Sequence, residues 1–225
     1  MSEVERDFDC IQCGETYIIT WTSKHDPSHC PFCGAFIETP EDDEDIGIDY
    51  SLTSPALTII NNDTINFFCL TKSEKKILEW SNISNINVQL YKPWDNDLQR
   101  YHNLANWVIN CCITAISPER PKAYIEDYAY AATGRVFNIA ENMAILKDTL
   151  NKWGIKYEMI APTIIKKFAT EKGNANKEKM YEAFADKTNR NLMKEFNINK
   201  LNNPITDIVD SYFIAKYGQT HGNNT

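Results

Sequence analysis

Apolar residues after position 45 fall into short blocks that are typical of β-strands. The block 46–60 is apolar at both ends and polar around 51–55, which indicates a strand, a turn and a second strand. The block 64–70 predicts a further strand, separated from the second by the turn-forming stretch 61–63. A short strand is also expected near 87–91. This part of the chain therefore begins with a group of consecutive strands.

The rest of the chain alternates helical periodicity with short apolar strands. Apolar side chains that recur every three or four residues predict helices, and β-branched and aromatic runs predict strands. A group of strands followed by alternating helices and strands predicts an α/β fold, with a mixed sheet and helices on both of its faces. The predicted elements are helices over 95–116, 136–153, about 175–189 and about 204–217, and strands over 122–128 and 155–162.

Residues 1–37 carry two Cys-x-x-Cys pairs, each followed by glycine. The pairs are Cys10 with Cys13 and Cys30 with Cys33, with sixteen residues between them. Each pair makes a tight turn, and two facing turns bring four thiolates to one tetrahedral ion, the geometry that zinc prefers. The intervening TYIITW has the composition of a strand. The module resembles zinc ribbons, and we predict one zinc ion held by these four cysteines.

The zinc is predicted to be structural, because four cysteines leave no coordination position open. A segment of about 35 residues buries too little apolar surface to fold alone, so a metal is expected to hold it together. Two alternatives remain: the pairs are redox dithiols, or their spacing is fortuitous. His25 and His29 are further candidate ligands, although four cysteines already complete the site.

Charge is distributed unevenly along the chain. The formal net charge is −8, but residues 1–45 hold 12 Asp/Glu and 2 Lys/Arg, whereas residues 46–225 hold 19 and 21. The Pro-containing acidic stretch 38–45 is interpreted as a solvated linker. The main domain is expected over 46–217, followed by a flexible tail over 218–225. Because the main domain is nearly neutral, its charge neither excludes nor requires a nucleic-acid partner.

Four carboxylates in apolar surroundings are candidate metal ligands. Asp49 lies in the first predicted strand, Glu126 ends a later one, and Asp207 and Asp210 share one face of the last predicted helix. Each also has an ordinary interpretation, as a turn residue or as solvated helix surface. Two like charges about 4 Å apart repel by about 4 kcal/mol at the dielectric of a protein surface. Four gathered carboxylates therefore call for hard cations such as Mg²⁺, which can clamp the reacting oxygens of a phosphodiester.

Four segments of the chain resemble the RuvC family of Holliday-junction resolvases, within the RNase H-like superfamily. They keep one order along the main domain: an aspartate strand, a glutamate strand, a lysine-bearing stretch and a D-x-x-D helix. The lysine-bearing stretch has the pattern P-x-x-[IV]-K-K followed by T-x-x-G-x-A-x-K. The segments are GIDYSLTSPAL (47–57), AYIEDY (123–128), IAPTIIKKFATEKGNANKEKM (160–180) and NPITDIVDSYFIA (203–215).

The resemblance implies an RNase H-like mixed sheet flanked by helices, and a two-metal active site. The four carboxylates would bind two Mg²⁺ ions, with Mn²⁺ as the alternative. The two lysines of the motif, eleven residues apart, would lie near the scissile phosphate. Ordinary surface lysine is the other interpretation of both. The catalytic residues that the resemblance implies are Asp49, Glu126, Asp207, Asp210, Lys166 and Lys177.

The contacts to DNA are less sharply indicated. Bacterial relatives often carry a phenylalanine wedge three residues after the glutamate, where this chain has Ala129, and the stretch YAYAATGR resembles phage and poxvirus relatives. Its tyrosines can stack on bases or pack in the core. The lysines around 166–179 form the densest basic stretch, which would meet phosphates. The candidate DNA-binding residues are Tyr128, Tyr130, Arg135, Lys167, Lys172 and Lys179.

The predicted function is that of a structure-selective endodeoxyribonuclease that resolves four-way junctions. The resemblance implies a homodimer, products with 5′-phosphate and 3′-hydroxyl ends, and a phage setting. No apolar run approaches a membrane span and the first residues lack a signal-peptide core, so we expect a cytoplasmic protein, in the host cell if viral, without a membrane partner. One alternative is a catalytically idle RNase H-like scaffold whose zinc ribbon recruits a transcription or replication complex. Another is a nuclease of this fold that cuts other branched or single-stranded DNA.

Overall fold

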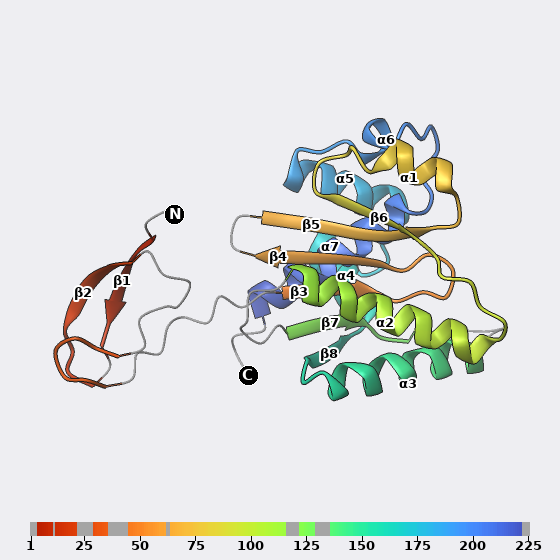
Figure 1. The fold of residues 1–225 in the computed structure, drawn as a ribbon. Helices are drawn as coiled ribbons and strands as arrows, with labels where there is room; N and C mark the ends of the chain where they lie inside the picture. The colour runs from red at the N-terminus through yellow and green to blue at the C-terminus, as the bar shows by residue number, and fades with distance from the viewer. Residues whose placement is uncertain are drawn as a thin grey trace. The chain divides into compact units, whose positions relative to one another are not determined.

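In the computed structural model, the chain divides into two compact units, Met1–Asp42 and Asp43–Thr225 (Figure 1). Each unit has its own strands and its own hydrophobic core. The structure describes residues 4–10, 12–21, 29–35, 45–61, 64–115, 122–128 and 136–221. Among these residues, no helix combines the length and the apolar character needed to cross a bilayer.

The first unit contains an antiparallel hairpin of strands β1 (Val4–Asp9) and β2 (Thr16–Trp21). Its core is small. Phe8 and Tyr17 stack with their ring centroids 5.9 Å apart, and they pack with two of the cysteines. So small a core supplies little of the free energy needed to order the segment, and a metal cross-link is the usual remedy.

The second unit contains a six-stranded mixed sheet in the order β6-β5-β4-β3-β7-β8. The first two strand pairs along the chain, β3 with β4 and β4 with β5, are antiparallel, whereas β7 is parallel to β3 and to β8. The order β5-β4-β3-β7-β8 is that of an RNase H-like sheet, and β6 adds a parallel edge strand beside β5. The expected fold class is confirmed. The strands are β3 (Asp45–Asp49), β4 (Ala56–Asn61), β5 (Thr64–Thr71), β6 (Ile86–Leu90), β7 (Lys122–Glu126) and β8 (Lys156–Ile160).

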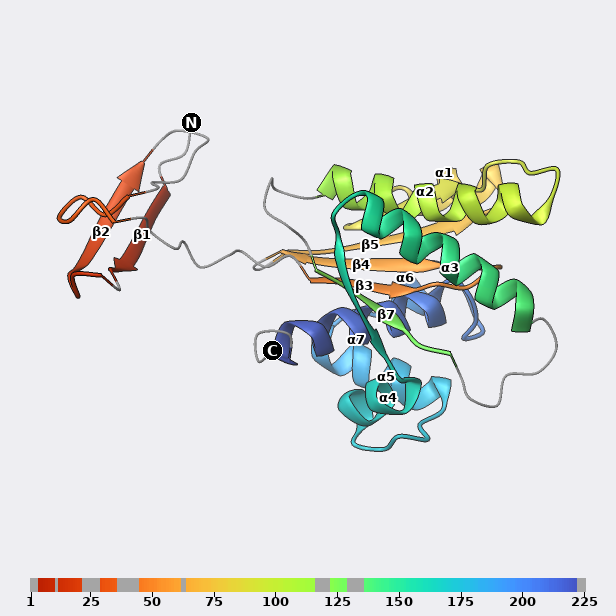
Figure 2. The same ribbon diagram turned by 90° about the horizontal axis from the view of Figure 1, so that it is seen from below.

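Helices cover both faces of this sheet. Figure 2 shows α2 and α3 on one face and α4, α5 and α7 on the other. Each face has its own apolar core, because the central strands carry buried side chains on both sides. The helices are α1 (Glu74–Trp80), α2 (Asp97–Ala115), α3 (Val136–Lys152), α4 (Pro162–Thr170), α5 (Lys177–Thr188), α6 (Leu192–Glu195) and α7 (Ile205–His221).

Helix α7 packs directly on β3 at Gly47. A Cβ atom at Gly47 would lie 2.1 Å from the backbone oxygen of Ser211 and 2.3 Å from the backbone nitrogen of Ala215, so the approach requires glycine. The Ser211 hydroxyl also shares a hydrogen bond with the Thr58 hydroxyl of β4, with 2.8 Å between the oxygens. These contacts hold the first turns of α7 beside the centre of the sheet.

Three helices were not expected from the sequence, and one is longer than expected. Helices α1, α4 and α6 have no more than nine residues, too few to establish a helical period. Helix α7 runs to His221, so the predicted start of a flexible tail at 218 is wrong. Gly218 lies within this last part of the helix, and its missing Cβ leaves room for the ring of Tyr124. Asp45, expected in the linker, is the first residue of β3.

Candidate functional site

The candidate carboxylates come from three elements that meet at one edge of the sheet. Asp49 is the last residue of β3 and Glu126 is the last residue of β7. Because these strands are parallel neighbours, their carboxyl ends lie together. Asp207 lies in the first turn of α7, and Asp210 follows three residues later, on the same face of the helix. The packing of α7 on β3 brings both aspartates to this edge.

Burial and mutual repulsion raise the pKa of the strand carboxylates. The side chain of Asp49 is 9% exposed, and burial raises its pKa well above the usual value. The charges of Asp207, Asp210 and Glu126 raise it further. Burial, followed by the charge of Asp210, raises the pKa of Glu126 to about 7. The four carboxylates are therefore one electrostatic cluster.

Burial also raises the pKa of the two helix carboxylates, and nearby side chains partly offset this rise. Burial raises the pKa of Asp207 and of Asp210 to about 6. The Ser54 hydroxyl, in the loop after β3, donates a hydrogen bond to the Asp207 carboxylate and lowers that pKa. Lys177 lowers the pKa of both aspartates, and Lys166 lowers that of Asp210.

The two motif lysines lie beside the cluster, on neighbouring helices. Lys166 lies on α4, and its charge also lowers the pKa of Glu126. Lys177 is the first residue of α5, and its charge also lowers the pKa of Asp49. The Lys177 ammonium donates to the hydroxyl of Thr206, which precedes Asp207, over 3.5 Å. The tertiary structure thus brings all six predicted catalytic residues together.

The donor set of this cluster fits a hard divalent cation. It consists of carboxylate oxygens, the ligands that Mg²⁺ and Mn²⁺ prefer. Repulsion among partly desolvated carboxylates is relieved by a cation between them. Within the described part of the chain, however, no three of these carboxylates place oxygens within 4.8 Å of one another. A bound ion would therefore have to draw the side chains closer.

A cleft of about 740 Å³ opens beside Asp49 and Glu126. The loop after β3 and the start of α3 form its other walls, which are largely apolar. Tyr128 lines the cleft with its side chain 38% exposed, and the ammonium of Lys147 lies 5.4 Å from its ring centroid. Tyr128 is thus placed where an aromatic ring can meet a base.

The other predicted DNA contacts are not brought to the cleft. Lys167, Lys172 and Lys179 are exposed, and no hydrogen bond or ion pair within the described residues joins them to the carboxylates. Tyr130 and Arg135 lie outside the described residues, as does His25. These assignments stay predictions.

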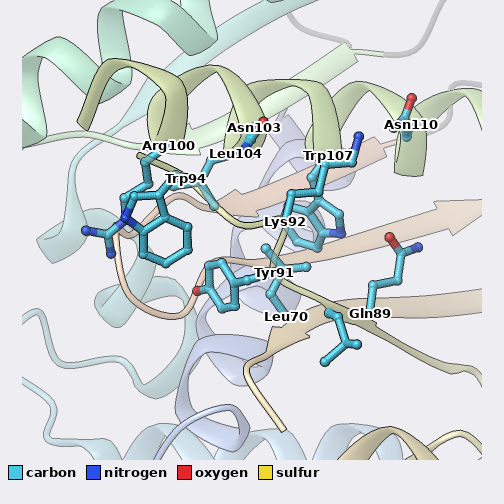
Figure 3. Close-up of a pocket in the computed structure, with 11 residues that line it drawn as sticks. Leu70, Gln89, Tyr91, Lys92, Trp94, Arg100, Asn103, Leu104, Trp107 and Asn110 are labelled. Carbon is cyan, nitrogen blue, oxygen red and sulfur yellow. The ribbon is translucent and has the colours of Figure 1, made fainter. Parts of the chain in front are cut away.

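Two residues that support the site were missed by the sequence argument. Ser54 lies in the segment GIDYSLTSPAL, which resembles the RuvC family, so the sequence offered a signal that this serine belongs to the site. Arg100 of α2 had no such signal. Its guanidinium donates to the backbone oxygen of Leu52 and lies 4.9 Å from the ring centroid of Trp94. Figure 3 shows Arg100 and Trp94 side by side, with Tyr91 near them. Arg100 therefore ties α2 to the loop that carries Ser54.

A separate candidate metal site lies in the first unit. The sulfurs of Cys10 and Cys33 lie 3.6 Å apart, those of Cys13 and Cys30 lie 3.8 Å apart, and all four lie within 4.8 Å. Zinc–sulfur bonds of about 2.3 Å in a tetrahedron place sulfurs about 3.8 Å apart, so the donor set fits one zinc ion. Among the described residues, no other set of three or more cysteine, histidine, aspartate or glutamate side chains brings its ligand atoms this close together.

Backbone geometry preorganises the four sulfurs. The amides of Gly14 and Gly34 donate to the carbonyl oxygens of Cys10 and Cys30, over 2.7 and 2.9 Å. Both glycines have positive φ angles of 74° and 71°, which other residues rarely adopt. Burial raises the pKa of Cys30, but hydrogen bonds from the backbone amides of Cys33 and Phe32, together with the Tyr17 hydroxyl, outweigh it and bring that pKa down to about 6. A thiolate is the form that binds zinc.

Comparisons with known proteins identify similar solved structures but no sequence relative. No protein-family model matches the chain, and no curated protein matches it in sequence. A Thermus thermophilus RuvC structure is 12% identical with a TM-score of 0.48, over 79% of this chain and 95% of that one. T. thermophilus RuvC in complex with Holliday junction substrate is 11% identical with a TM-score of 0.49, over 80% and 96%. The crystal structure of the yeast mitochondrial Holliday junction resolvase Ydc2 is similar at 15% identity and a TM-score of 0.46, over 77% of this chain and 76% of that one.

Proposed function

We propose that the chain is a divalent-metal-dependent endodeoxyribonuclease that resolves Holliday junctions. The observation that carries the proposal is the cluster of Asp49, Glu126, Asp207 and Asp210. Burial raises the pKa of all four carboxyl groups, and repulsion from neighbouring carboxylates raises the pKa of the first three further. Such a cluster costs free energy of folding unless a cation binds it. Its presence at an open cleft therefore favours a role in chemistry over a role in stability.

The site residues have separable roles in this proposal. Asp49 and one of the α7 aspartates would share one Mg²⁺ or Mn²⁺ ion, and Glu126 would help to hold a second. Bound there, the ions would lower the pKa of the attacking water and neutralise charge on the phosphate. The ammonium groups of Lys166 and Lys177 would stabilise charge that develops on the non-bridging phosphate oxygens. The Ser54 hydroxyl orients the Asp207 carboxylate.

Branched DNA is the substrate class that best suits the cleft beside the carboxylates. A branch point supplies unstacked bases, and an exposed aromatic ring such as Tyr128 binds such bases by stacking. The sequence resemblance to RuvC-type resolvases narrows this class to four-way junctions. It also supports a homodimer that cuts symmetric strands, leaves ligatable ends and serves a phage in the cytoplasm of its host.

The four-cysteine site is proposed to hold one structural zinc ion. Its four thiolates complete a tetrahedron, so no position is left for a substrate or a water. We assign residues 1–37 to a zinc ribbon and the stretch from β3 to α7 to the nuclease domain.

A cleavage assay tests the proposed activity. Synthetic four-way junctions, Y-forks and linear duplexes of matched sequence are incubated with the protein and Mg²⁺. We expect Mg²⁺-dependent, symmetric cleavage of the junction, slower cleavage of the fork and none of the duplex. Asp49→Asn, Glu126→Gln and Asp210→Asn should each abolish cleavage and leave junction binding intact or tighter, because phosphate meets less negative charge.

Each other outcome selects a different function. Binding to branched DNA without cleavage at any divalent cation would favour the idle RNase H-like scaffold. Equal cleavage of forks or single strands would favour a nuclease of broader specificity. Near-native cleavage by two of the three carboxylate variants would contradict the metal assignment.

A further inference from the structure

A second groove lies next to the carboxylates, at Ser54 and Thr53. It has a volume of about 190 Å³, and its walls come from the loop after β3, the β5–α1 junction, Tyr91 and the segment before α7. Thr53 lines both this groove and the cleft at Asp49 and Glu126. Ser54 lines the groove and bonds to Asp207. The groove therefore adjoins the cleft at Thr53 and reaches the carboxylates at Ser54.

The groove carries two ammonium groups, those of Lys72 and Lys76. Both side chains are exposed, and among the described residues neither forms an ion pair with a carboxylate. Lys75, which precedes Lys76 on α1, differs because its ammonium pairs with the carboxylate of Glu79 over 3.5 Å. The groove thus has positive charge that the described chain does not neutralise.

Aromatic rings hold these two ammonium groups over the groove. The Lys76 nitrogen lies 4.8 Å from the ring centroid of Trp80, which is 3% exposed and so is not free to stack on a base. The Lys72 nitrogen lies 5.4 Å from Trp94 and 5.8 Å from Tyr91. Cation–π contacts of this kind restrict long lysine side chains without removing their charge.

We propose that this groove binds the sugar-phosphate backbone of the DNA strand that is cut, with Lys72 and Lys76 each contacting a phosphate that flanks the scissile one. The inference rests on the proposed nuclease function. Four carboxylates repel an approaching phosphate strand, and fixed ammonium groups beside them offset that repulsion. Lysine side chains already occupy the faces of the aromatic rings, so the groove suits the DNA backbone and not the bases. Binding there would not depend on the base sequence of the DNA.

The test combines protein variants with neutralised phosphates. Affinity for a four-way junction is measured against salt concentration in the Asp210→Asn background, which prevents cleavage. Replacing both Lys72 and Lys76 with alanine should weaken binding and reduce the slope of log affinity against log salt by about 1.4 to 1.8, that is about 0.7 to 0.9 for each lost contact. Lys75→Ala is the matched control and should leave the slope within error of the parent.

Replacing single phosphates of the DNA with uncharged methylphosphonates then shows which phosphates the two lysines contact. Placed one at a time beside the cleavage point, one or two of them should weaken binding of the parent and not of the Lys72→Ala, Lys76→Ala variant. Equal losses in both proteins, or an unchanged salt slope, would overturn the groove assignment even if the junction is cleaved normally. If the wild-type protein cleaves no DNA but these binding effects are seen, the proposed activity fails while the groove stands.

Discussion

The Ser54 hydroxyl donates a hydrogen bond to the Asp207 carboxylate, across 153 positions of sequence. The bond joins the loop after β3 to the first turn of α7, and both residues are buried. It fixes the orientation of one candidate metal ligand and lowers the pKa of that ligand against the effect of burial. Ser54 is therefore expected to act on the reaction through Asp207.

Ser54→Ala should slow single-turnover cleavage by about ten- to a hundredfold, because a hydrogen bond to a charged group contributes about 1.5–3 kcal/mol. Without the bond, the pKa of Asp207 rises further, so the acid limb of the rate profile should move to higher pH. Ser54→Thr keeps the hydroxyl and should restore the profile. Ser84→Ala, at an exposed position of the β5–β6 connection, is the control. A uniform loss of rate at all pH values would mean that Ser54 is only structural.

Lys177→Ala should lower the cleavage rate by about two to three orders of magnitude, because a preorganised donor at a developing charge contributes about 2.7–4 kcal/mol. Junction affinity should fall far less, since one phosphate contact changes the salt slope by only about one. Lys172→Ala is the control, because Lys172 is exposed and has no described contact with the carboxylates. If both variants weaken binding equally and spare the single-turnover rate, Lys177 belongs to a basic surface.

Without a divalent cation, the second unit should lose stability as pH rises from about 4 to 7. The pKa of Glu126 is about 7 in the fold against 4.5 usually. A raised carboxyl pKa means that the folded state binds the proton more tightly than the unfolded chain does. Protonation of Glu126 therefore adds to the free energy of unfolding. This contribution is fully present below about pH 4.5 and is lost as the pH rises through about 7.

Adding Mg²⁺ should therefore raise the melting temperature of the second unit more at pH 7.5 than at pH 5. Scanning calorimetry of the full chain, purified without Mg²⁺, measures the melting temperature at increasing Mg²⁺ concentrations. Mg²⁺ is added and not chelated, because a chelator would also remove zinc. The Asp49→Asn, Asp210→Asn variant should lose most of the pH dependence and of the Mg²⁺ response. An equal Mg²⁺ effect at both pH values would place the binding elsewhere.

Gly47→Ala should destabilise the second unit by more than about 3 kcal/mol, beyond the usual 1–3 kcal/mol of overpacking. The added methyl would meet the backbone of Ser211 and Ala215, which cannot move without displacing α7. Chemical denaturation measures the change. Ala215→Gly should not rescue it, because the clash is mainly with backbone atoms. Rescue would show that α7 tolerates a shift along β3.

One zinc ion per chain is expected by elemental analysis. Cys30→Ser should increase amide exchange in β1 and β2 and leave exchange in the strands and helices of the second unit unchanged, because the four sulfurs support the small core of the first unit. Recovery of the four cysteines as two disulfides, from protein purified without reductant, would contradict a zinc site.

Features that depend on residues close together in the chain could be predicted from the sequence. Two Cys-x-x-Cys turns predict a four-sulfur site, because local backbone geometry fixes the positions of the two sulfurs within each pair. The strands of the second unit and its long helices α2, α3, α5 and α7 follow from the pattern of apolar residues, whereas β1 of the first unit was not predicted. The six catalytic candidates were found through the order of motifs that resembles the RuvC family, because that order is carried by the chain itself.

Contacts between side chains from distant segments could not be predicted and are seen only in the folded protein. The hydrogen bond from Ser54 to Asp207, the support of their loop by Arg100, and the groove at Lys72 and Lys76 join segments that are distant in sequence. Strand order and the seating of α7 on Gly47 create these contacts, and no local pattern of residues encodes them. Gly218 is a further example, because the need for glycine there comes from the ring of Tyr124 on β7. Local periodicity specifies an element, but the contacts of each side chain depend on how all the elements pack.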